Sequence, residues 1–260
     1  MQKKSSLFKF YTILSLEIIG IYILWSIFAK AALPTPWEIL IGVKEIWTQD
    51  EFSHHLRVSL RLCFEGLFVS TVCALIISYG TKIPKIGKYI SPVATFISVT
   101  RFQSLVGILF ALMLYSPGAH IFKIMLITYG MTGFLTTSFV AVINEIPDAK
   151  FEHARTLRLS ELRVFWEVVV RGKRHMILEV MAQTFAIAFG MLSMVESYVR
   201  NEGGIGVYLS DMNKQFNMAK IFAVQLTIML TGLLSDFGIR LVNKWLHPYA
   251  FMNTKGSHGH

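Results

Sequence analysis

Residues 151–170 read FEHARTLRLSELRVFWEVVV and lie between two long apolar segments of the chain. Three acidic and three basic residues occur in this stretch: Glu152, Arg155, Arg158, Glu161, Arg163 and Glu167. So many charges do not belong in hydrocarbon, whereas the flanking segments have the composition that lipid requires. The fold therefore depends on whether the flanking segments cross a membrane and on which side the charged stretch emerges.

The composition of the whole chain is that of a polytopic membrane protein. Of its 260 residues, 53% are apolar and 16% are charged, and the mean hydropathy is +0.52. A soluble domain has about 45–50% apolar and about 25% charged residues. The net charge of +9 does not indicate nucleic-acid binding, because no DNA- or RNA-binding motif is visible and the basic residues gather in loops.

Six segments have about the 20 mainly apolar residues that a membrane-spanning helix needs. They are residues 8–28, 56–79, 89–115, 119–143, 176–199 and 220–242. The first could be a signal peptide, since Lys3 and Lys4 precede it and Ala29-Lys30-Ala31 resembles a cleavage site. Its apolar run is longer than the about 7–15 residues of a signal peptide, so we expect a retained helix.

The distribution of lysine and arginine gives the orientation. With the N-terminus inside, inner segments hold about twice as many basic residues as outer ones, as the positive-inside rule requires. Both termini and the loop of residues 144–174 are then cytoplasmic, and we expect a multi-pass membrane protein. The expected divisions are an N-terminal helix (1–32), an extracytoplasmic connector (33–55), a five-helix core (56–246) and a disordered tail (247–260).

The charged loop predicts two short helices. Pro147 and Asp148 suit the first turn of a helix that carries Phe151, Ala154 and Leu157 on one stripe. Ser160 can cap a second helix, after a bend at residues 158–160. From the residues alone, the loop is either an amphipathic connector on the membrane surface or a helix that docks in a groove of a soluble partner.

The segment IPDAKFEHARTLRLSELRVFWEVVV resembles the cytoplasmic EAA loop of bacterial ABC importer permeases. Glu152, Ala154, Arg155, Thr156 and Leu157 match its motif, and the nitrate/sulfonate/taurine branch is the nearest. Other stretches resemble the same branch over about residues 33–249, namely LPTP at 33–36, SLR at 59–61 with Gly66, Glu196 followed by GGIGVYL at 203–209, and Asp236, Arg240 and Trp245.

The resemblance implies an all-α permease of the bacterial inner membrane, like those of type I ABC importers, with six helices and a coupling helix between the fourth and fifth. It implies that seven residues contact a separate cytoplasmic ATPase: Phe151, Glu152, His153, Ala154, Arg155, Thr156 and Leu157. Further implied partners are a second permease copy or a paralogue, a solute-binding protein and membrane lipid. The chain has no G-x-x-x-x-G-K-[ST] motif, so ATP and Mg belong to the partner, and we expect no enzyme activity and no cofactor here.

The chain departs from the family pattern at several points. His153 replaces an alanine, Arg158 stands where the loop glycine is expected, and Arg171-Gly172 replaces Leu-Pro. Because glycine eases the bend, Arg158 must either adopt it with more strain or change it. If residues 151–157 sit in a groove of the ATPase, Glu152→Lys or Phe151→Ala should weaken ATPase binding and leave folding intact.

Several residues are candidates for the translocation path or its gate. Arg101, near the middle of the third segment, is either a positive point for an anionic solute or a structural charge that pairs with Glu196 or backbone carbonyls. Glu196 lines an outer gate or reaches the interface. Gly203, Gly204 and Gly206 permit a re-entrant outer loop at residues 200–218. The adjacent His54 and His55 lack a third ligand nearby, so we expect no metal site.

The expected function is therefore transport of a small, anionic solute such as nitrate, bicarbonate or a sulfonate. The alternative is an ion-coupled carrier or channel without an ATPase, although no internal repeat between the halves is visible. A membrane enzyme is disfavoured because neither H-E-x-x-H nor G-x-S-x-G occurs.

Overall fold

The computed structural model describes residues 33–248 continuously, together with residues 12, 13, 15–17, 19, 20, 22, 23 and 25. This part of the chain is helical and contains no strand. Its helices are α2 (Pro36–Trp47), α3 (Asp50–Gly80), α4 (Gly87–Val99), α5 (Leu105–Tyr115), α6 (Ala119–Asn144), α7 (Asp148–Thr156), α8 (Glu161–Val164), α9 (Arg174–Tyr198), α10 (Ile205–Lys214) and α11 (Met218–Leu246). A 3-10 turn, η1 (Thr100–Phe102), and a π-helix, η2 (Phe165–Arg171), complete the series.

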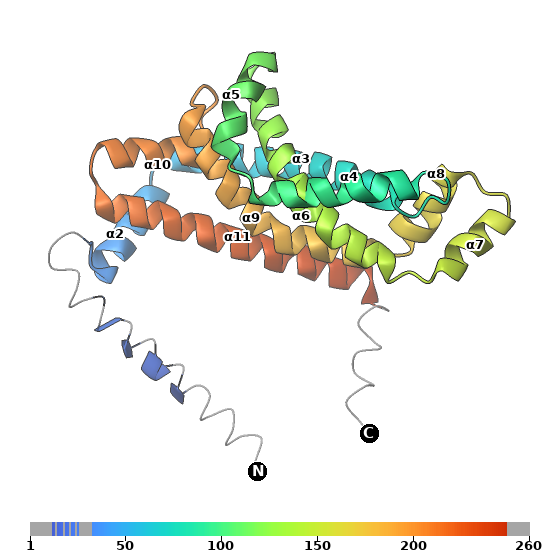
Figure 1. The fold of residues 1–260 in the computed structure, drawn as a ribbon. Coiled ribbons are helices and arrows are strands. Elements are labelled where there is room, and N and C mark those ends of the chain that lie inside the picture. The colour runs from blue at the N-terminus through green and yellow to red at the C-terminus, as the bar shows by residue number, and fades with distance from the viewer. Residues whose placement is uncertain are drawn as a thin grey trace, which may run out of the picture.

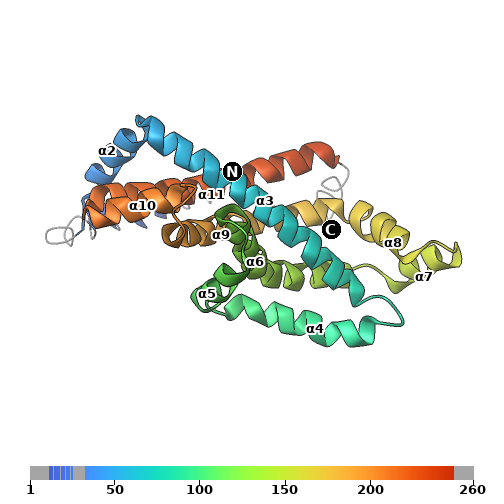
Figure 2. The same ribbon diagram turned by 90° about the horizontal axis from the view of Figure 1, so that it is seen from above.

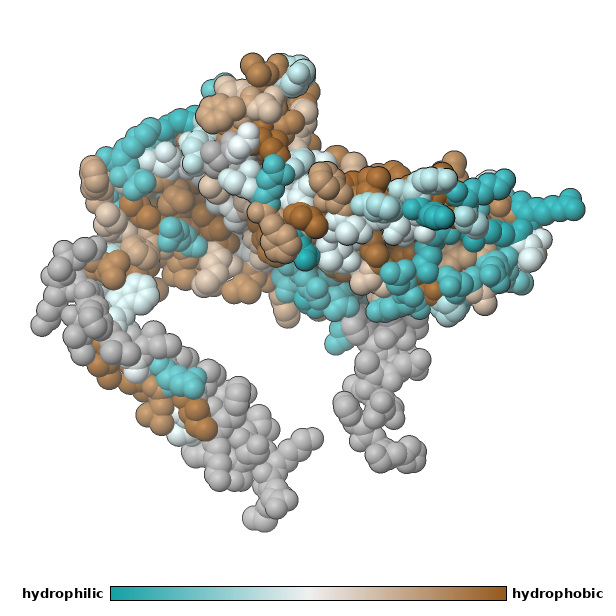
Figure 3. Space-filling view, viewed as in Figure 1, coloured by the Kyte–Doolittle hydropathy of each residue, from teal (hydrophilic) through white to brown (hydrophobic). Residues whose placement is uncertain are grey.

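The helices form an elongated bundle with α2 and α10 at one end and α7 and α8 at the other, which we call the α10 end and the α7 end (Figure 1). Within the described residues, α3, α6, α9 and α11 are each long and apolar enough to cross a membrane. These four correspond to the second, fourth, fifth and sixth predicted spans. Most of the first, at residues 8–28, lies outside the described residues. Hydrophilic side chains cover the α7 end, where Figure 3 is mostly teal.

Helix ends follow local sequence signals. Thr35 caps α2 by accepting a hydrogen bond from the Glu38 amide, Glu38 reaches back to the Thr35 amide, and Pro36 occupies the first turn. Asn217 caps α11 by accepting from the Lys220 amide. The helices α3, α6 and α11 run toward the α7 end, and α9 runs back toward the α10 end (Figure 1).

The centre of the bundle is held by close contacts between helices. α3 packs most extensively on α6, and α11 on α9, while α4 lies along the outside beside α6 (Figure 2). A Cβ atom at Gly66 would lie 2.9 Å from Cγ2 of Ile127, so the absence of a side chain lets α3 approach α6. Small residues at such contacts maximise van der Waals attraction, which is what holds helices together where lipid is as apolar as the core.

The predicted third span, residues 89–115, is not one straight helix. The helix is interrupted at η1, and the axes of the two helical segments before and after this break differ by 113°. Gln103 is extended there, and α5 starts only after Ser104. The break falls in the sequence Thr-Arg-Phe-Gln-Ser, where polar side chains interrupt the apolar run. With this bent pair taken as one span, the described residues contain five spans.

Candidate functional site

The loop between α6 and α9 is built as the sequence predicts, from two helices joined by a bend. α7 ends at Thr156 and α8 begins at Glu161. Arg158 lies in the bend with a φ of +56°, the left-handed conformation that glycine adopts without strain. Arg158 therefore keeps the bend expected of the family and carries the strain that glycine would avoid.

The inner side of this loop forms a small apolar core. Phe151 and Ala154 are 2% and 6% exposed. They pack with residues from the end of α3, from the end of α6 and the turn after it, from α8 and from η2: Tyr79, Ile143, Ile146, Val164 and Val169. Phe151 is thus an internal residue of the loop, and truncating it to alanine would remove buried volume at a cost of about 3–5 kcal/mol. The burial of Phe151 contradicts the expectation that Phe151→Ala leaves folding intact.

Polar contacts attach the same loop to the end of α3. Arg155 donates from Nε to Oε1 of Glu161 at 2.9 Å and from Nη2 to the Lys82 carbonyl at 3.2 Å. The Tyr79 hydroxyl donates to Oε2 of Glu161 at 2.6 Å. Lys82 Nζ forms an ion pair of 3.0 Å with Asp148 at the start of α7. The bond from Arg155 holds the pKa of the Glu161 carboxyl below its usual range.

The outer side of the loop remains open. Of the predicted coupling residues, Glu152, His153, Thr156 and Leu157 are exposed and Arg155 is half-buried. Large apolar side chains accompany them, since Leu157 is 62%, Leu162 81% and Trp166 59% exposed. An apolar surface with a charged rim is the composition of a docking site for another protein. Which of these residues bind an ATPase stays a prediction.

The α10 end contains a buried carboxylate, Glu196, which is 0% exposed. The Ser59 hydroxyl lies 2.7 Å and 2.8 Å from the two carboxylate oxygens, and the Gly206 amide donates to Oε2 at 3.0 Å. The Ile205 amide in turn donates to Ser59 at 2.7 Å. Glu196 therefore neither reaches the membrane interface nor faces open solvent. It links α9 to α3 and to the first turn of α10.

The three glycines that were predicted to shape the outer loop lie against this carboxylate. Gly203 and Gly204 have φ values of +74° and +126°, and a Cβ at Gly204 would meet the Glu196 carboxyl at 2.5 Å or less. A Cβ at Gly206 would lie 2.7 Å from the Ser193 carbonyl carbon. The glycines thus turn the chain back, so that α10 lies on α9. A role of this segment in gating remains a prediction.

Two more polar contacts fasten the loop. The buried Lys123 donates to the Gly203 carbonyl at 3.0 Å, and the Gly204 amide donates to Nδ1 of His55 at 2.9 Å. His55 therefore has a structural partner, and no group of three or more potential metal ligands occurs in the described part of the chain.

Arg101 lies in η1, at the break between α4 and α5, and is half-buried. Its Nη1 donates to the Thr137 hydroxyl on α6 at 3.2 Å, and its guanidinium lies 4.6 Å from the centre of the Phe102 ring. Nε is buried and has no hydrogen-bond partner among the described residues. Glu196 is engaged by Ser59 and Gly206, so the structure brings Glu196 together with the three glycines but not with Arg101.

Sequence reasoning missed a polar groove between α4 and α6. Five of its nine lining residues carry hydroxyl groups: Thr81, Ser91, Thr95, Ser98 and Thr137. The groove measures about 330 Å³ and also contacts Lys82 and Asn144. The spacing of Ser91, Thr95 and Ser98 over two helical turns was visible in the sequence and could have revealed it.

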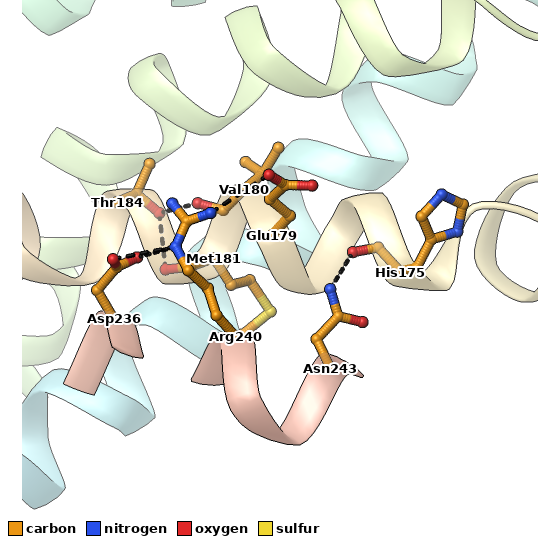
Figure 4. A network of polar contacts seen from close by, with 8 residues as sticks. All are labelled: His175, Glu179, Val180, Met181, Thr184, Asp236, Arg240 and Asn243. Carbon is orange, nitrogen blue, oxygen red and sulfur yellow. Dashed lines mark hydrogen bonds and ion pairs between the residues drawn. The ribbon is translucent and has the colours of Figure 1, made fainter. Parts of the chain in front are cut away.

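A second polar network joins α9 to α11 at the α7 end (Figure 4). Arg240 lies between Asp236 at 3.0 Å and Glu179 at 3.3 Å, and Asn243 donates to the His175 carbonyl at 2.8 Å. Asp236 and Arg240, which resemble family positions in the last helix, therefore tie that helix to the start of α9.

Comparisons with known proteins concern both the sequence and the fold. A family model described as "Binding-protein-dependent transport system inner membrane component" matches residues 66–248, which is more than half of the chain. A search of curated proteins finds no match.

Two solved structures resemble this chain. One is the crystal structure of a bacterial alginate ABC transporter in complex with an alginate pentasaccharide-bound periplasmic protein, with a TM-score of 0.57 and 16% identity over 90% of this chain and 94% of that chain. The other is a bacterial ABC transporter involved in the import of the acidic polysaccharide alginate, with a TM-score of 0.56 and 15% identity over 92% of each chain. At these identities the likeness is one of fold.

Proposed function

The chain belongs to the family of binding-protein-dependent transport system inner membrane components, and we propose that it forms the translocation path of an ATP-driven importer for a small, anionic solute. Because the chain belongs to this family, it is a multi-pass permease subunit and not an enzyme. The observation that carries the coupling part of the proposal is the open outer side of the α7–α8 loop. There, an exposed apolar surface lies on a segment that is fastened by its other side to α3 and α6.

An ATPase partner accounts for this surface better than lipid does. Glu152, His153 and Thr156 are exposed beside Leu157, and a surface that mixes these groups suits a protein groove. The π-helix η2 separates the loop from α9 and leaves α7 and α8 projecting from the α7 end of the bundle (Figure 1). We place this end in the cytoplasm, in agreement with the predicted distribution of basic residues.

Three further partners belong to the proposal. A solute-binding protein would meet the α10 end, and one of the two similar solved transporters is in complex with a periplasmic protein that carries its solute. A second permease copy or a paralogue would cover part of α5, which projects sideways from the bundle and exposes Phe110, Leu114 and Tyr115 (Figure 1). Membrane lipid would cover the remaining apolar surface.

The anionic character of the solute is supported by charge. Arg101 is the one arginine within a bent span of the described chain, and half-buried arginine at membrane depth attracts anions. The alginate of the similar transporters is also acidic, although their identity to this chain of 15–16% extends only to the fold. Nitrate, bicarbonate and sulfonates are the solutes that the sequence resemblance favours.

The test is purification of the tagged chain from its native host in mild detergent, followed by mass spectrometry. We expect an ABC ATPase in near-equal amount with the wild type. Two exposed changes, Leu157→Asp and Glu152→Lys, should remove the ATPase, because both alter the proposed docking surface without touching the buried core. The matched control is Glu51→Lys, an exposed charge reversal at the α10 end that should retain it.

A wild-type chain that purifies without any ATPase would contradict the proposal and favour an ion-coupled carrier. Loss of the ATPase in the control as strongly as in the loop variants would also contradict it, because the effect would then not belong to this surface.

A further inference from the structure

The groove between α4 and α6 is a polar strip between two of the candidate membrane spans, since α4 forms the first part of the bent pair. Ser91, Thr95 and Ser98 follow one face of α4, and Thr137 and Asn144 face them from α6. On each helix the first and last of these residues are seven positions apart, which corresponds to about 10 Å of helix. The groove therefore runs from the α7 end to near the level of Arg101.

The opposite face of α4 has a different composition. Tyr89, Val93 and Phe96 are 74%, 52% and 71% exposed, and side chains of this kind suit lipid or another apolar surface. A helix with one apolar and one hydroxyl face at membrane depth separates lipid from a polar path. The hydroxyl face is thus the side on which water or a solute belongs.

The charged residue in the lining of the groove is basic. Neither aspartate nor glutamate lines the groove, Lys82 lies at its α7 end, where its ammonium pairs with Asp148 outside the lining, and Arg101 contacts the groove wall through Thr137. The hydroxyls of Thr95 and Ser98 donate to carbonyls of their own helix, Ser91 and Ala94. Each of these carbonyls also accepts a backbone hydrogen bond within α4. The hydroxyls can therefore turn toward a solute without leaving a buried acceptor unpaired.

We propose that this groove is a subsite for a small oxyanion, with Lys82 at its inner end and Arg101 at its outer end. The proposal rests on the proposed function, since it specifies where an anionic solute binds on its way through the permease. Two cations and a row of hydroxyls without a nearby carboxylate in the lining recognise the oxygen atoms of a sulfonate, sulfate, nitrate or carboxylate. A neutral sugar would leave Arg101 without a counter-charge among the described residues, and it would not compete with Asp148 for Lys82.

Lys82 gives the subsite a direct connection to α7. Its ammonium pairs with Asp148 at 3.0 Å, and its carbonyl accepts a hydrogen bond from Arg155. An oxyanion at the inner end competes with Asp148 for the same ammonium. Occupation of the groove therefore weakens one of the contacts that hold α7, so the solute and the partner bound at α7 act on a shared residue.

The experiment measures the reactivity of introduced cysteines toward two thiol reagents of similar size. One is a methanethiosulfonate that bears a sulfonate, and the other bears a trimethylammonium group. The full-length chain is used in inside-out membrane vesicles, with Cys63 and Cys73 replaced by alanine to remove background. Ser98→Cys tests the groove, Thr95→Cys repeats the test should the first variant fold poorly, and Phe96→Cys on the other face of α4 is the control.

We expect the anionic reagent to modify Ser98→Cys about tenfold faster than the cationic one, which is the effect of unit charges several ångströms away in a partly solvated site. Lys82→Gln should reduce this preference, and inorganic sulfate should slow the reaction. Phe96→Cys should react slowly with both reagents.

Equal rates with the two reagents at both groove positions, or a faster cationic reaction, would overturn the proposal, as would reactivity no greater than that of Phe96→Cys. The measurement requires neither ATP nor a partner. An anion-selective groove in a chain that purifies without an ATPase would therefore refute the proposed function alone, and a non-selective groove in a chain that purifies with one would refute this inference alone.

Discussion

Replacement of Gly206 by alanine should detach α10 from α9. A Cβ at this position would overlap the Ser193 carbonyl oxygen, and it would lie 2.7 Å from the carbonyl carbon and 2.9 Å from Cβ of Glu196. Carbon atoms in contact are about 3.5–4.0 Å apart, so the backbones must separate by at least about 1 Å. Ser193 lies within α9, whose carbonyls cannot move independently, and the first turn of α10 must therefore shift.

The size of the effect follows from what this shift breaks. Overpacking costs about 1–3 kcal/mol. The amides of Gly206 and Ile205 would also lose their buried hydrogen bonds to Glu196 and Ser59, at about 1 kcal/mol each. The sum is about 3–5 kcal/mol, which corresponds to a fall in Tm of about 10 °C for a chain of this length.

The assay is thermal unfolding of the purified chain in mild detergent. The matched control is Gly190→Ala on α9, where a Cβ would meet nothing within 4 Å. This exposed change should raise stability by about 0.5–1 kcal/mol, since alanine is the better helix former. A Gly206→Ala variant that melts at or above the wild-type temperature would refute the reasoning, because α10 would then have room that the structure denies it.

Three further results are expected at the α7 end. Arg158→Gly should stabilise the loop by about 0.5–1 kcal/mol, since it removes the about 1–2 kcal/mol strain of a left-handed residue but adds freedom to the unfolded chain, whereas Arg158→Ala should change unfolding little. The Glu161 carboxyl, with its pKa lowered by Arg155, stabilises the fold above its unfolded pKa near 4.5 and loses this effect as pH falls through the folded value. Protection of peptides from 148–164 against hydrogen exchange, relative to the intrinsic rate at each pH, should therefore fall only below about pH 4.5, and less so in Glu161→Gln. Tyr79→Phe should lower the same protection at neutral pH. Unchanged protection in either exchange test would contradict the corresponding contact, and an Arg158→Gly variant that melts no higher than the wild type would contradict the strain at Arg158.

The long helices could be predicted from the sequence because their signal is strong and local. A run of about 20 apolar residues has few alternatives in a membrane, and the helices around residues 56–79 and 176–199 end near their predicted limits. The break in the third span was harder to predict, because composition alone does not distinguish a straight helix from two bent ones. The polar sequence around Arg101 is visible, but the apolar runs on both sides of it predict one continuous helix that contains a charge.

The candidate site was less predictable, since it depends on contacts between distant residues. The apolar stripe predicted for α7 is buried at Phe151 and Ala154, whereas Leu157 follows the helix and is exposed. The pattern does not reveal whether an apolar residue of the stripe meets its own chain or a partner. Phe151 is buried because Tyr79, from the end of α3 and far away in sequence, lies against it. Glu196 was assigned to a gate or an interface because nothing local indicates that Ser59 and the Gly206 amide surround it.

The attachment of α7 combines two kinds of contact with different consequences. The partly exposed pairs of Lys82 with Asp148 and of Arg155 with Glu161 are each worth about 0–1 kcal/mol, so they add little to the strength of the attachment. Buried Phe151 is worth several times more and keeps the loop seated. The weak pairs can therefore exchange partners while the loop stays in place. A displacement of α7 by a bound protein would reach the inner end of the α4–α6 groove through Lys82 without unfolding the loop.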